Sequence, residues 1–227
     1  MPHSLLSWLR SYLSGRTQFV KINGELSREI TVKSGVPQGS HLGPLFFILF
    51  INDLSLVLHE VNFWLYADDL KMCKVVKNVS DVTILQNNFY NVAQWCKKNG
   101  MTLNLDKCNS ISFTRSFSPI QADYEFEGYQ LKRVKIIKDL GVWLDCRMTY
   151  KHHLDITIGR ATSILSLVKR FSKEFDDPYV TRSLYLSLVA PILEYANVVW
   201  MPFFKCDVKR IESVQKQFLI FALRNLG

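Results

Sequence analysis

The sequence predicts a mixed α+β fold that ends in a bundle of helices. Up to about residue 147, short runs of alternating apolar and polar residues, typical of strands, stand between segments of helical periodicity. After Tyr150 only the helical periodicity continues, in three segments. Hydrophobic residues make up 48% of the 227 residues, which is enough for a sizeable core. We therefore expect two domains, residues 1–147 and 148–227.

The first domain is expected to begin with a short helix and a hairpin. Apolar residues recur at helical spacing over Ser4–Ser14, and the two alternating runs that follow are joined by Asn23-Gly24, a strong hairpin signal. A glycine-rich loop, Ser34–Ser40, then precedes a helix expected over Leu42–Leu58, with Ser40 as its cap. That helix is apolar nearly all round at first and is therefore predicted to be buried.

The remaining elements alternate between strands and helices. Phe63–Val76 is predicted to be a strand, a turn and a strand, and Ser80 is expected to cap a helix that ends near Gly100. Further strands are expected over Met101–Leu105, Asn109–Phe113, Tyr124–Leu131, Val134–Lys138 and Leu140–Asp145. The second domain is predicted to consist of helices over His153–Lys173, Tyr179–Asn197 (kinked at Pro191) and Asp207–Leu226.

Charge and composition indicate what kind of partner and which cellular compartment suit the protein. The net charge is +8, with 17 basic and 13 acidic residues up to Arg147 and 11 and 7 after it, so the excess is spread along the chain. That distribution suits a polyanionic partner, but from charge alone an ordinary basic surface is the favoured explanation. The longest apolar run, Leu45–Ile51, is far shorter than the roughly 20 residues of a membrane span. Five scattered cysteines and the lack of a secretory pattern indicate an intracellular protein, nuclear or cytoplasmic, without membrane contact.

The most distinctive short stretch is Tyr66-Ala67-Asp68-Asp69. Aspartate is common in turns, so the pair could simply be a solvated hairpin tip. The flanking residues Leu65 and Leu70 are apolar, however, and unpartnered carboxylates in apolar surroundings are costly. Magnesium prefers such oxygen ligands and is usually shared between carboxylates and substrate phosphates. Two ions about 4 Å apart can clamp an in-line phosphoryl transfer, but they also need a third carboxylate to bridge them.

The loop before the apolar helix is a second candidate site. Gly35 and Gly39 could remove Cβ atoms where another backbone or a flat base comes close, and the amide of Gln38 suits a base edge or a sugar. Taken alone, the segment is better explained as a plain loop ahead of a buried helix.

Together these segments resemble the reverse transcriptases of non-long-terminal-repeat retrotransposons, and most closely the jockey-like elements of animals. The similarity is carried by SGVPQGSHLGPLFFILFINDL, YADD, NGMTLNLDKC, KDLGVWLD and LYLSLVAPILEYANVVW, which cover nearly the whole chain in register. The resemblance implies a polymerase palm with an antiparallel sheet and packed helices over residues 1–147. It implies a small, all-α, thumb-like region over residues 148–227.

The resemblance also implies roles for particular residues in RNA-directed DNA polymerisation. Asp68 matches a ligand of two catalytic magnesium ions, and Asp69 is its supporting neighbour. Tyr66 and Ala67 match positions that face the primer end and the metal. Lys107 matches a position near the triphosphate and is a candidate acid for the leaving pyrophosphate.

Further matched positions concern the nucleic acid. Pro37, Gln38 and Gly39 match a segment that contacts the template and the incoming nucleotide, and Leu140 and Gly141 match a loop that holds the primer strand. The implied partners are an RNA template, a DNA primer and deoxynucleoside triphosphates. A basic run could meet backbone phosphates or form a solvated strand edge: Lys132, Arg133, Lys135 and Lys138.

One expected ligand has no counterpart in the sequence. The family's bridging carboxylate belongs to a strand ahead of the segment that matches Leu5–Gly15. Glu25 and Glu29 are predicted to be surface residues, Asp53 to be structural and Asp106 to pair with Lys107. We therefore expect the chain alone to have little or no activity without the preceding part of the same polyprotein. The alternatives are a non-catalytic nucleic-acid-binding module retained by a host and, less in keeping with the thumb-like motif, a group II intron maturase.

Overall fold

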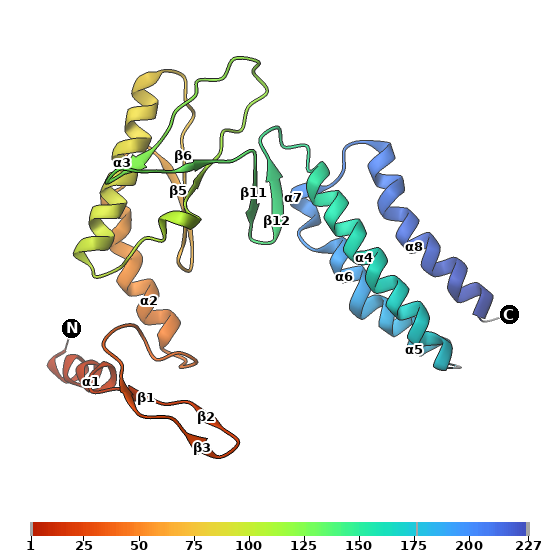
Figure 1. Cartoon of the computed structure of the whole chain (residues 1–227), viewed down its shortest axis with the longest axis horizontal. Coiled ribbons are helices and arrows are strands. Elements are labelled where there is room, and N and C mark those ends of the chain that lie inside the picture. Colours follow the sequence, from red (N-terminus) through yellow and green to blue (C-terminus); the bar gives the residue numbers. More distant parts are fainter. Residues whose placement is uncertain (1, 176, 226–227) are drawn as a thin grey trace. The chain divides into compact units, whose positions relative to one another are not determined.

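The computed structural model describes residues 2–175 and 177–225, which mix helices with short paired strands as predicted (Figure 1). The chain divides into two compact units, Met1–Leu103 and Asn104–Gly227. The boundary predicted after residue 147 lies within the second unit, and its meaning as a boundary between palm and thumb stays a prediction.

The first unit opens with the predicted helix and hairpin. Helix α1 spans His3–Leu13. The hairpin pairs β1 (Thr17–Gln18) with β4 (Ile30–Thr31), and β2 (Lys21–Ile22) with β3 (Glu25–Leu26). Asn23 and Gly24 form its turn, with φ angles of 51° and 93°, the signs that a type I′ turn requires. The prediction from Asn23-Gly24 is confirmed.

The apolar helix is shorter and more exposed than predicted. Helix α2 spans Gly43–Ile51 and continues as the 3-10 helix η1 (Asn52–Val57). The prediction that this helix is buried all round is wrong for the part of the chain that the structure describes. Four large side chains remain between 42% and 60% exposed: Leu45, Ile48, Leu49 and Phe50. Phe47 and Ile51 do reach the core, so one stripe of the helix packs while the rest faces outward.

Helix α3 (Val79–Lys98) organises the core of the first unit. Its cap is Asn78 rather than the predicted Ser80: the Asn78 side chain accepts a hydrogen bond from the backbone of Asp81, and the Asp81 carboxylate accepts one in return. Its apolar side chains Phe89, Val92 and Cys96 are buried. Val92 and Cys96 pack with residues of α2, η1 and the hairpin of β5 (Asn62–Tyr66) and β6 (Asp69–Cys73).

The second unit starts with short strands. The strand predicted over Met101–Leu105 is absent; the chain there is irregular and ends in the 3-10 helix η2 (Leu105–Lys107). The strands that do form are β7 (Asn109–Ser110), β8 (Glu125–Phe126), β9 (Tyr129–Gln130), β10 (Lys132–Arg133), β11 (Ile136–Asp139) and β12 (Val142–Asp145). They make separate two-stranded ladders, antiparallel for β8–β9 and β11–β12 and parallel for β7–β10.

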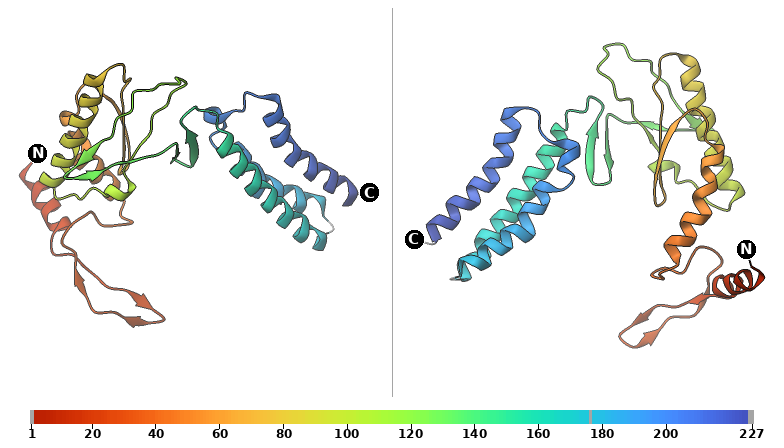
Figure 2. Two further views of the ribbon diagram at one scale, coloured as in Figure 1. Left: turned by 45° about the horizontal axis from the view of Figure 1, so that its top comes forward. Right: turned by 180° about the vertical axis from the view of Figure 1, so that it is seen from behind.

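Helices build the rest of the second unit (Figure 2). They are α4 (Lys151–Phe171), η3 (Ser172–Glu174), α5 (Pro178–Leu184), the π-helical turn η4 (Tyr185–Val189), α6 (Ala190–Glu194), α7 (Asn197–Trp200) and α8 (Lys205–Asn225). Pro191 lacks an N–H group, and the wider π-helical turn η4 ends two residues before it, which is the irregularity that the helix shows near the predicted kink. Leu226, the predicted end of the last helix, lies outside the described residues.

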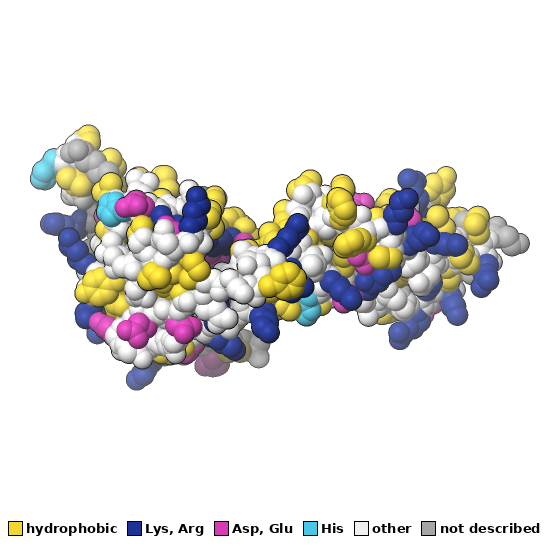
Figure 3. All heavy atoms as spheres, turned by 90° about the horizontal axis from the view of Figure 1, so that it is seen from above, with side chains coloured by type: hydrophobic (Ala, Val, Ile, Leu, Met, Phe, Trp, Pro, Cys, Tyr) yellow, Lys and Arg dark blue, Asp and Glu magenta, His cyan; other side chains and the backbone are white. Residues whose placement is uncertain are grey.

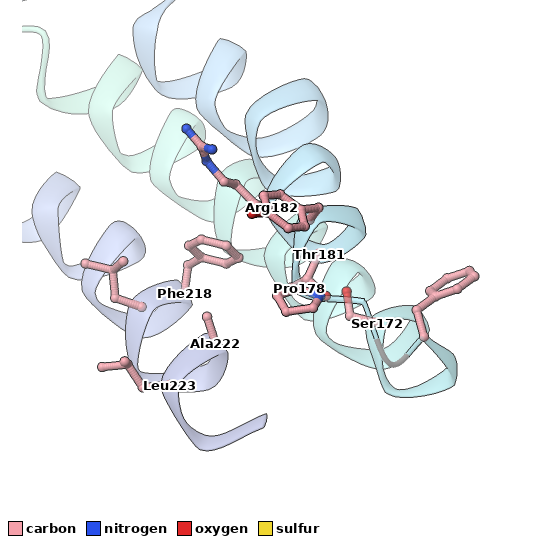
Figure 4. Close-up of a pocket in the computed structure, with 10 residues that line it drawn as sticks. Ser172, Pro178, Thr181, Arg182, Phe218, Ala222 and Leu223 are labelled. Carbon is pink, nitrogen blue, oxygen red and sulfur yellow. The ribbon is translucent and has the colours of Figure 1, made fainter. Parts of the chain in front are cut away.

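The helical core is formed by side chains from α4, η4, α6 and α8. Ala161 and Leu165 of α4, Val189 of η4 and Val214 of α8 are each at most 1% exposed. An apolar groove of about 320 Å³ opens between α5 and α8, with Pro178 and Phe218 on facing sides (Figure 4). None of the helices within residues 2–175 and 177–225 has the length and apolarity needed to cross a bilayer.

Candidate active site

The acidic turn is the tip of a regular hairpin. Strands β5 and β6 pair with Tyr66 opposite Asp69, which leaves Ala67 and Asp68 as a two-residue turn. Ala67 has a φ of 51°, in the left-handed region that costs an L-residue roughly 1–2 kcal/mol. Such strain persists only where the surrounding structure fixes it, and it is frequent at functional sites. A positive φ at the first residue is a general requirement of two-residue hairpin turns, so what is unusual here is an alanine where glycine, asparagine or aspartate is usual.

The side chains of the hairpin divide between two faces. Leu65 and Leu70 pack against the core, whereas Tyr66 is 64% exposed and Asp69 lies opposite it on the outer face. Asp68 is also exposed, so the apolar flanks do not surround the carboxylates. Within the described part of the chain, neither carboxylate makes a hydrogen bond or an ion pair. Both carboxylates are thus accessible to an external ligand.

The donor set of the turn fits magnesium in its chemistry. Adjacent carboxylate oxygens are hard ligands, and magnesium usually takes only one or two carboxylates together with phosphates and water. Among residues 2–175 and 177–225, no group of three or more His, Cys, Asp or Glu side chains could hold a metal ion. Asp68 and Asp69 therefore offer two carboxylates but no complete two-ion cage.

The glycine loop is fixed at both ends. Gly35 and Gly39 have φ angles of 82° and 77°, and nothing lies within 4 Å of the position of a Cβ on either residue. These glycines are needed for their left-handed backbone, and the close approach predicted for them is not seen within the chain. Gln38 is exposed beside them. The guanidinium of Arg16 donates to the carbonyl oxygens of Leu13 and Gly35, a tie that sequence reasoning missed.

The far end of the loop is packed against the start of α2. The N-cap position of α2 is Leu42, not the predicted Ser40, but the Gly43 N–H donates to Ser40 Oγ at 3.0 Å, so Ser40 still satisfies the first N–H of the helix. A Cβ at Gly43 would lie 3.0 Å from the carbonyl oxygen of Pro37. Gly43 therefore allows the loop and the helix to approach closely, although its sequence context, just before Pro44, did not single it out.

Two acids outside the turn have internal partners. Asp53 accepts a hydrogen bond from Trp95 Nε1 at 3.1 Å, in agreement with its predicted structural role. Asp106 accepts one from Tyr129 Oη at 3.0 Å, and this bond raises the pKa of Tyr129. Asp106 therefore pairs with Tyr129, where pairing with Lys107 was expected. Lys107 is exposed on η2, in the second unit.

The loop predicted to hold the primer is a tight turn between β11 and β12. Leu140 and Gly141 have φ angles of 42° and 89° and lie between the paired residues Asp139 and Val142. The hydroxyl of Tyr195 donates to the carbonyl oxygen of Leu140 at 2.8 Å. Sequence reasoning missed this contact, which joins residues 55 positions apart.

A small core joins the β11–β12 hairpin to the helices. Val142 packs with Leu154 and Trp200, which are 1% and 2% exposed. The Trp143 N–H donates to Nδ1 of His153 at 3.3 Å, and the His153 ring packs edge-on against Trp200. Burial lowers the pKa of His153, and the neighbouring His152 lowers it further. His153 is thus held neutral as an acceptor.

The basic run next to this hairpin serves the structure at two positions. Arg133 donates to Ser112 Oγ at 2.9 Å and to the carbonyl oxygen of Ala122, so its guanidinium is used internally. The Lys138 ammonium lies 5.8 Å from the centre of the Trp143 ring. Elsewhere, on the face shown in Figure 3, basic side chains are scattered among apolar and acidic ones.

Comparison with known proteins assigns the family. The profile described as reverse transcriptase (RNA-dependent DNA polymerase) matches residues 1–144. In Drosophila melanogaster, a probable RNA-directed DNA polymerase from transposon BS is 30% identical over 92% of this chain and 24% of its own length. The probable enzyme from transposon X-element is 28% identical over 96% of this chain and 25% of its own. The RNA-directed DNA polymerase from mobile element jockey is 24% identical over the same shares.

These relatives confirm the predicted resemblance to jockey-like elements. The chain spans about a quarter of the length of the curated relatives that it matches. No solved structure gave a significant match. With more than half of its residues covered by the family profile, the chain belongs to the reverse transcriptase (RNA-dependent DNA polymerase) family.

Proposed function

We propose that this chain forms the palm and thumb regions of a retrotransposon polymerase that copies an RNA template into DNA. The observation that carries the proposal is the strained turn at Ala67-Asp68, which presents two unpartnered carboxylates within the segment matched by the family profile. The positive φ of Ala67 is what a two-residue hairpin turn requires, so the support for a site comes from the two exposed carboxylates without internal partners, and the strained alanine is only in keeping with it.

In this proposal Asp68 and Asp69 hold magnesium together with the phosphates of the incoming nucleotide. A magnesium ion bound there would neutralise the negative charge that develops on the transferred phosphoryl group. The exposed ring of Tyr66, opposite Asp69 on the outer face, offers the end of the primer a surface on which to pack. The inner face of the hairpin, anchored in the core, keeps these groups in place.

The other predicted residues take supporting roles. Pro37, Gln38 and Gly39 contact the template and the nucleotide; the exposure of Gln38 and the open space beside Gly39 support that role. Lys107 donates a proton to, or stabilises, the leaving pyrophosphate, as its exposed ammonium would allow. The turn at Leu140-Gly141 holds the primer strand.

We further propose that the described residues do not complete the catalytic site. Two carboxylates can hold one ion with phosphates, but bridging two ions requires a third, and no such group of acids is present among residues 2–175 and 177–225. The third carboxylate would come from another part of the polyprotein. The isolated chain would then have little or no polymerase activity.

A primer-extension assay tests both proposals. The purified 227-residue chain and a full-length polyprotein that contains it are each given an RNA template, a DNA primer, nucleotides and magnesium. We expect extension by the polyprotein only, and its loss on Asp68→Ala but not on Glu25→Ala, a matched change at an exposed hairpin acid.

Two outcomes would contradict the proposals. Magnesium-dependent extension by the isolated chain that disappears with Asp68→Ala would show that the site is complete without a third carboxylate from elsewhere. Binding of primer and template by the polyprotein with no extension at all would favour the second candidate, a nucleic-acid-binding module without catalysis.

A further inference from the structure

The turn at Leu140-Gly141 is held by one side chain from a distant part of the sequence. Tyr195 Oη donates to the carbonyl oxygen of Leu140 at 2.8 Å. The Tyr195 ring also covers the next residue: a Cβ at Gly141 would lie 3.0 Å from Cε1 of that ring. The aromatic ring and its hydroxyl therefore contact both residues of the turn.

Tyr195 is itself fixed by its backbone. Its N–H donates to the carbonyl oxygen of Pro191 at 3.1 Å, which closes the last turn of α6. Its carbonyl oxygen accepts a hydrogen bond from Trp200 Nε1 at 2.7 Å, and Trp200 is 2% exposed. Ala196 follows with a φ of 52°, so the chain leaves the path of α6 directly after Tyr195. These constraints aim the side chain before any ligand is bound.

The hydrogen bond between Tyr195 and Leu140 restricts the turn more than it stabilises the fold. Tyr195 is 57% exposed, so its hydroxyl could be satisfied by water, and a fully buried ring is not what keeps it in place. A hydrogen bond at such a site contributes little to global stability but limits the conformations of a two-residue turn. A residue of this kind is expected where the position of the turn matters for function.

We propose that Tyr195 is the positioning residue of the primer-holding turn. By fixing the Leu140 carbonyl and covering Gly141, it sets the place at which the turn meets the primer strand. The inference rests on the proposed function, because the turn's role toward the primer belongs to that function. It adds a residue from the helical region to the polymerase site, through the turn rather than by contact with reacting groups.

The test compares Tyr195→Phe, which removes only the hydroxyl, with Tyr179→Phe, a change at a 74% exposed tyrosine of α5. In the purified 227-residue chain, amide hydrogen exchange is followed for the peptide over Ile136–Asp145. Loss of one hydrogen bond should speed exchange at the turn about threefold to tenfold in Tyr195→Phe and leave it unchanged in Tyr179→Phe.

A binding measurement addresses the primer. Fluorescence anisotropy compares an RNA template carrying a DNA primer with a recessed 3′ end against a blunt duplex of the same length. Tyr195→Phe should reduce the preference for the recessed end by about threefold or more while leaving blunt-duplex affinity unchanged. Gly141→Ala, which crowds the tyrosine ring without removing its hydroxyl, should act in the same direction.

The two measurements test different parts of the proposal. Unchanged exchange at the turn in Tyr195→Phe overturns the positioning role, whatever the binding result. Faster exchange with an unaltered preference for the recessed end overturns the link to the primer. A wild-type chain without any preference for the recessed end overturns the primer role of the turn, and with it the proposed function of that segment, while the exchange result still reports on Tyr195.

Discussion

Two hairpins of the molecule carry predicted site residues, and they are held in different ways. Both have two-residue turns whose first residue has a positive φ, Ala67 at 51° and Leu140 at 42°. The acidic hairpin β5–β6 packs through its inner face and leaves the carboxylates of its tip without internal partners. The hairpin β11–β12 is tied at its tip by Tyr195. The first arrangement leaves the Asp68 and Asp69 carboxylates accessible to a ligand. The second holds the Leu140-Gly141 turn in one position.

The difference predicts which substitutions affect chemistry and which affect structure. Changes at the acidic tip should remove function without unfolding the protein, because its side chains are exposed. Changes around the second tip should alter stability or local order first, because its contacts reach a buried core. Substitutions at the two tips and in the core behind the second one test that contrast.

The largest effect is expected at Asp68. In a full-length polyprotein, Asp68→Asn should lower the rate of primer extension by about 10³-fold or more, since a neutral amide is a far poorer magnesium ligand. Asp69→Asn should cost less, because that residue is predicted only to support its neighbour. Thermal melting of the 227-residue variants should stay close to that of the wild type. A large drop in stability for Asp68→Asn would mean that the tip is structural after all.

A stability change of several kcal/mol is expected at Trp200. This side chain is 2% exposed, packs with Val142 and Leu154, and donates to the Tyr195 carbonyl. Trp200→Ala should lower the free energy of unfolding by about 3–5 kcal/mol in urea titrations followed by circular dichroism. Trp64, on the outer face of β5, is 57% exposed, and Trp64→Ala should cost less than about 1 kcal/mol. Equal costs would remove the contrast between the hairpins.

Substituting one residue in each turn should change the free energy of unfolding by a smaller amount. Gly141→Ala should destabilise by about 1–3 kcal/mol, because alanine is strained at a φ of 89° and its Cβ would meet the Tyr195 ring. Ala67→Gly should change stability by less than about 1 kcal/mol, since relief of strain offsets the added freedom of the unfolded chain. Chemical denaturation of the two variants measures both. A large loss from Ala67→Gly would show that the methyl group makes an unrecognised contact.

Local signals predicted much of this architecture. The hairpin at Asn23-Gly24 was predictable because the dipeptide itself favours the turn, and the paired acids at Asp68 were found through their neighbours in sequence. The burial of α2 was predicted wrongly, because apolarity shows that a helix can pack but not what it packs against. Asn78 was missed as a cap since Asp81 stands where a glutamate is more usual.

Contacts between distant residues could not be predicted in the same way. Nothing near Tyr195 in the sequence indicates that its hydroxyl reaches Leu140, because that contact depends on where α6 ends and on the left-handed backbone of Ala196. The partner of Asp106 was misjudged for the same reason: Lys107 is adjacent in sequence, whereas Tyr129 lies on strand β9, more than 20 residues further along the chain. The candidate site residues can thus be recognised from short stretches of sequence, whereas the contacts that hold them in place join residues far apart in the chain.

The smallest effect is expected from pH, and it should be confined to the second hairpin. His153 accepts a hydrogen bond from the Trp143 N–H, which requires a neutral Nδ1. Burial, with His152 nearby, keeps the pKa of His153 below its usual value of about 6.5. As pH falls below that value, the unfolded chain takes up the proton before the folded one, so stability is complete above about pH 6.5 and declines below it.

The measurement is urea unfolding of the second unit's helices, followed by circular dichroism at pH 7.5 and 5.5, in the wild type and in His153→Asn. Asparagine can accept the same hydrogen bond but does not titrate, so this variant should lose part of the pH dependence, whereas His59→Gln, at an exposed histidine, should not. Asp145 cannot account for the same window: burial favours its neutral form, but hydrogen bonds from Thr149, Arg147 and Tyr150 outweigh that effect and hold its pKa below the usual range. A pH profile unchanged by His153→Asn would therefore show that this histidine does not hold the β11–β12 hairpin to the helices, leaving Tyr195 and the Trp200 core to do so.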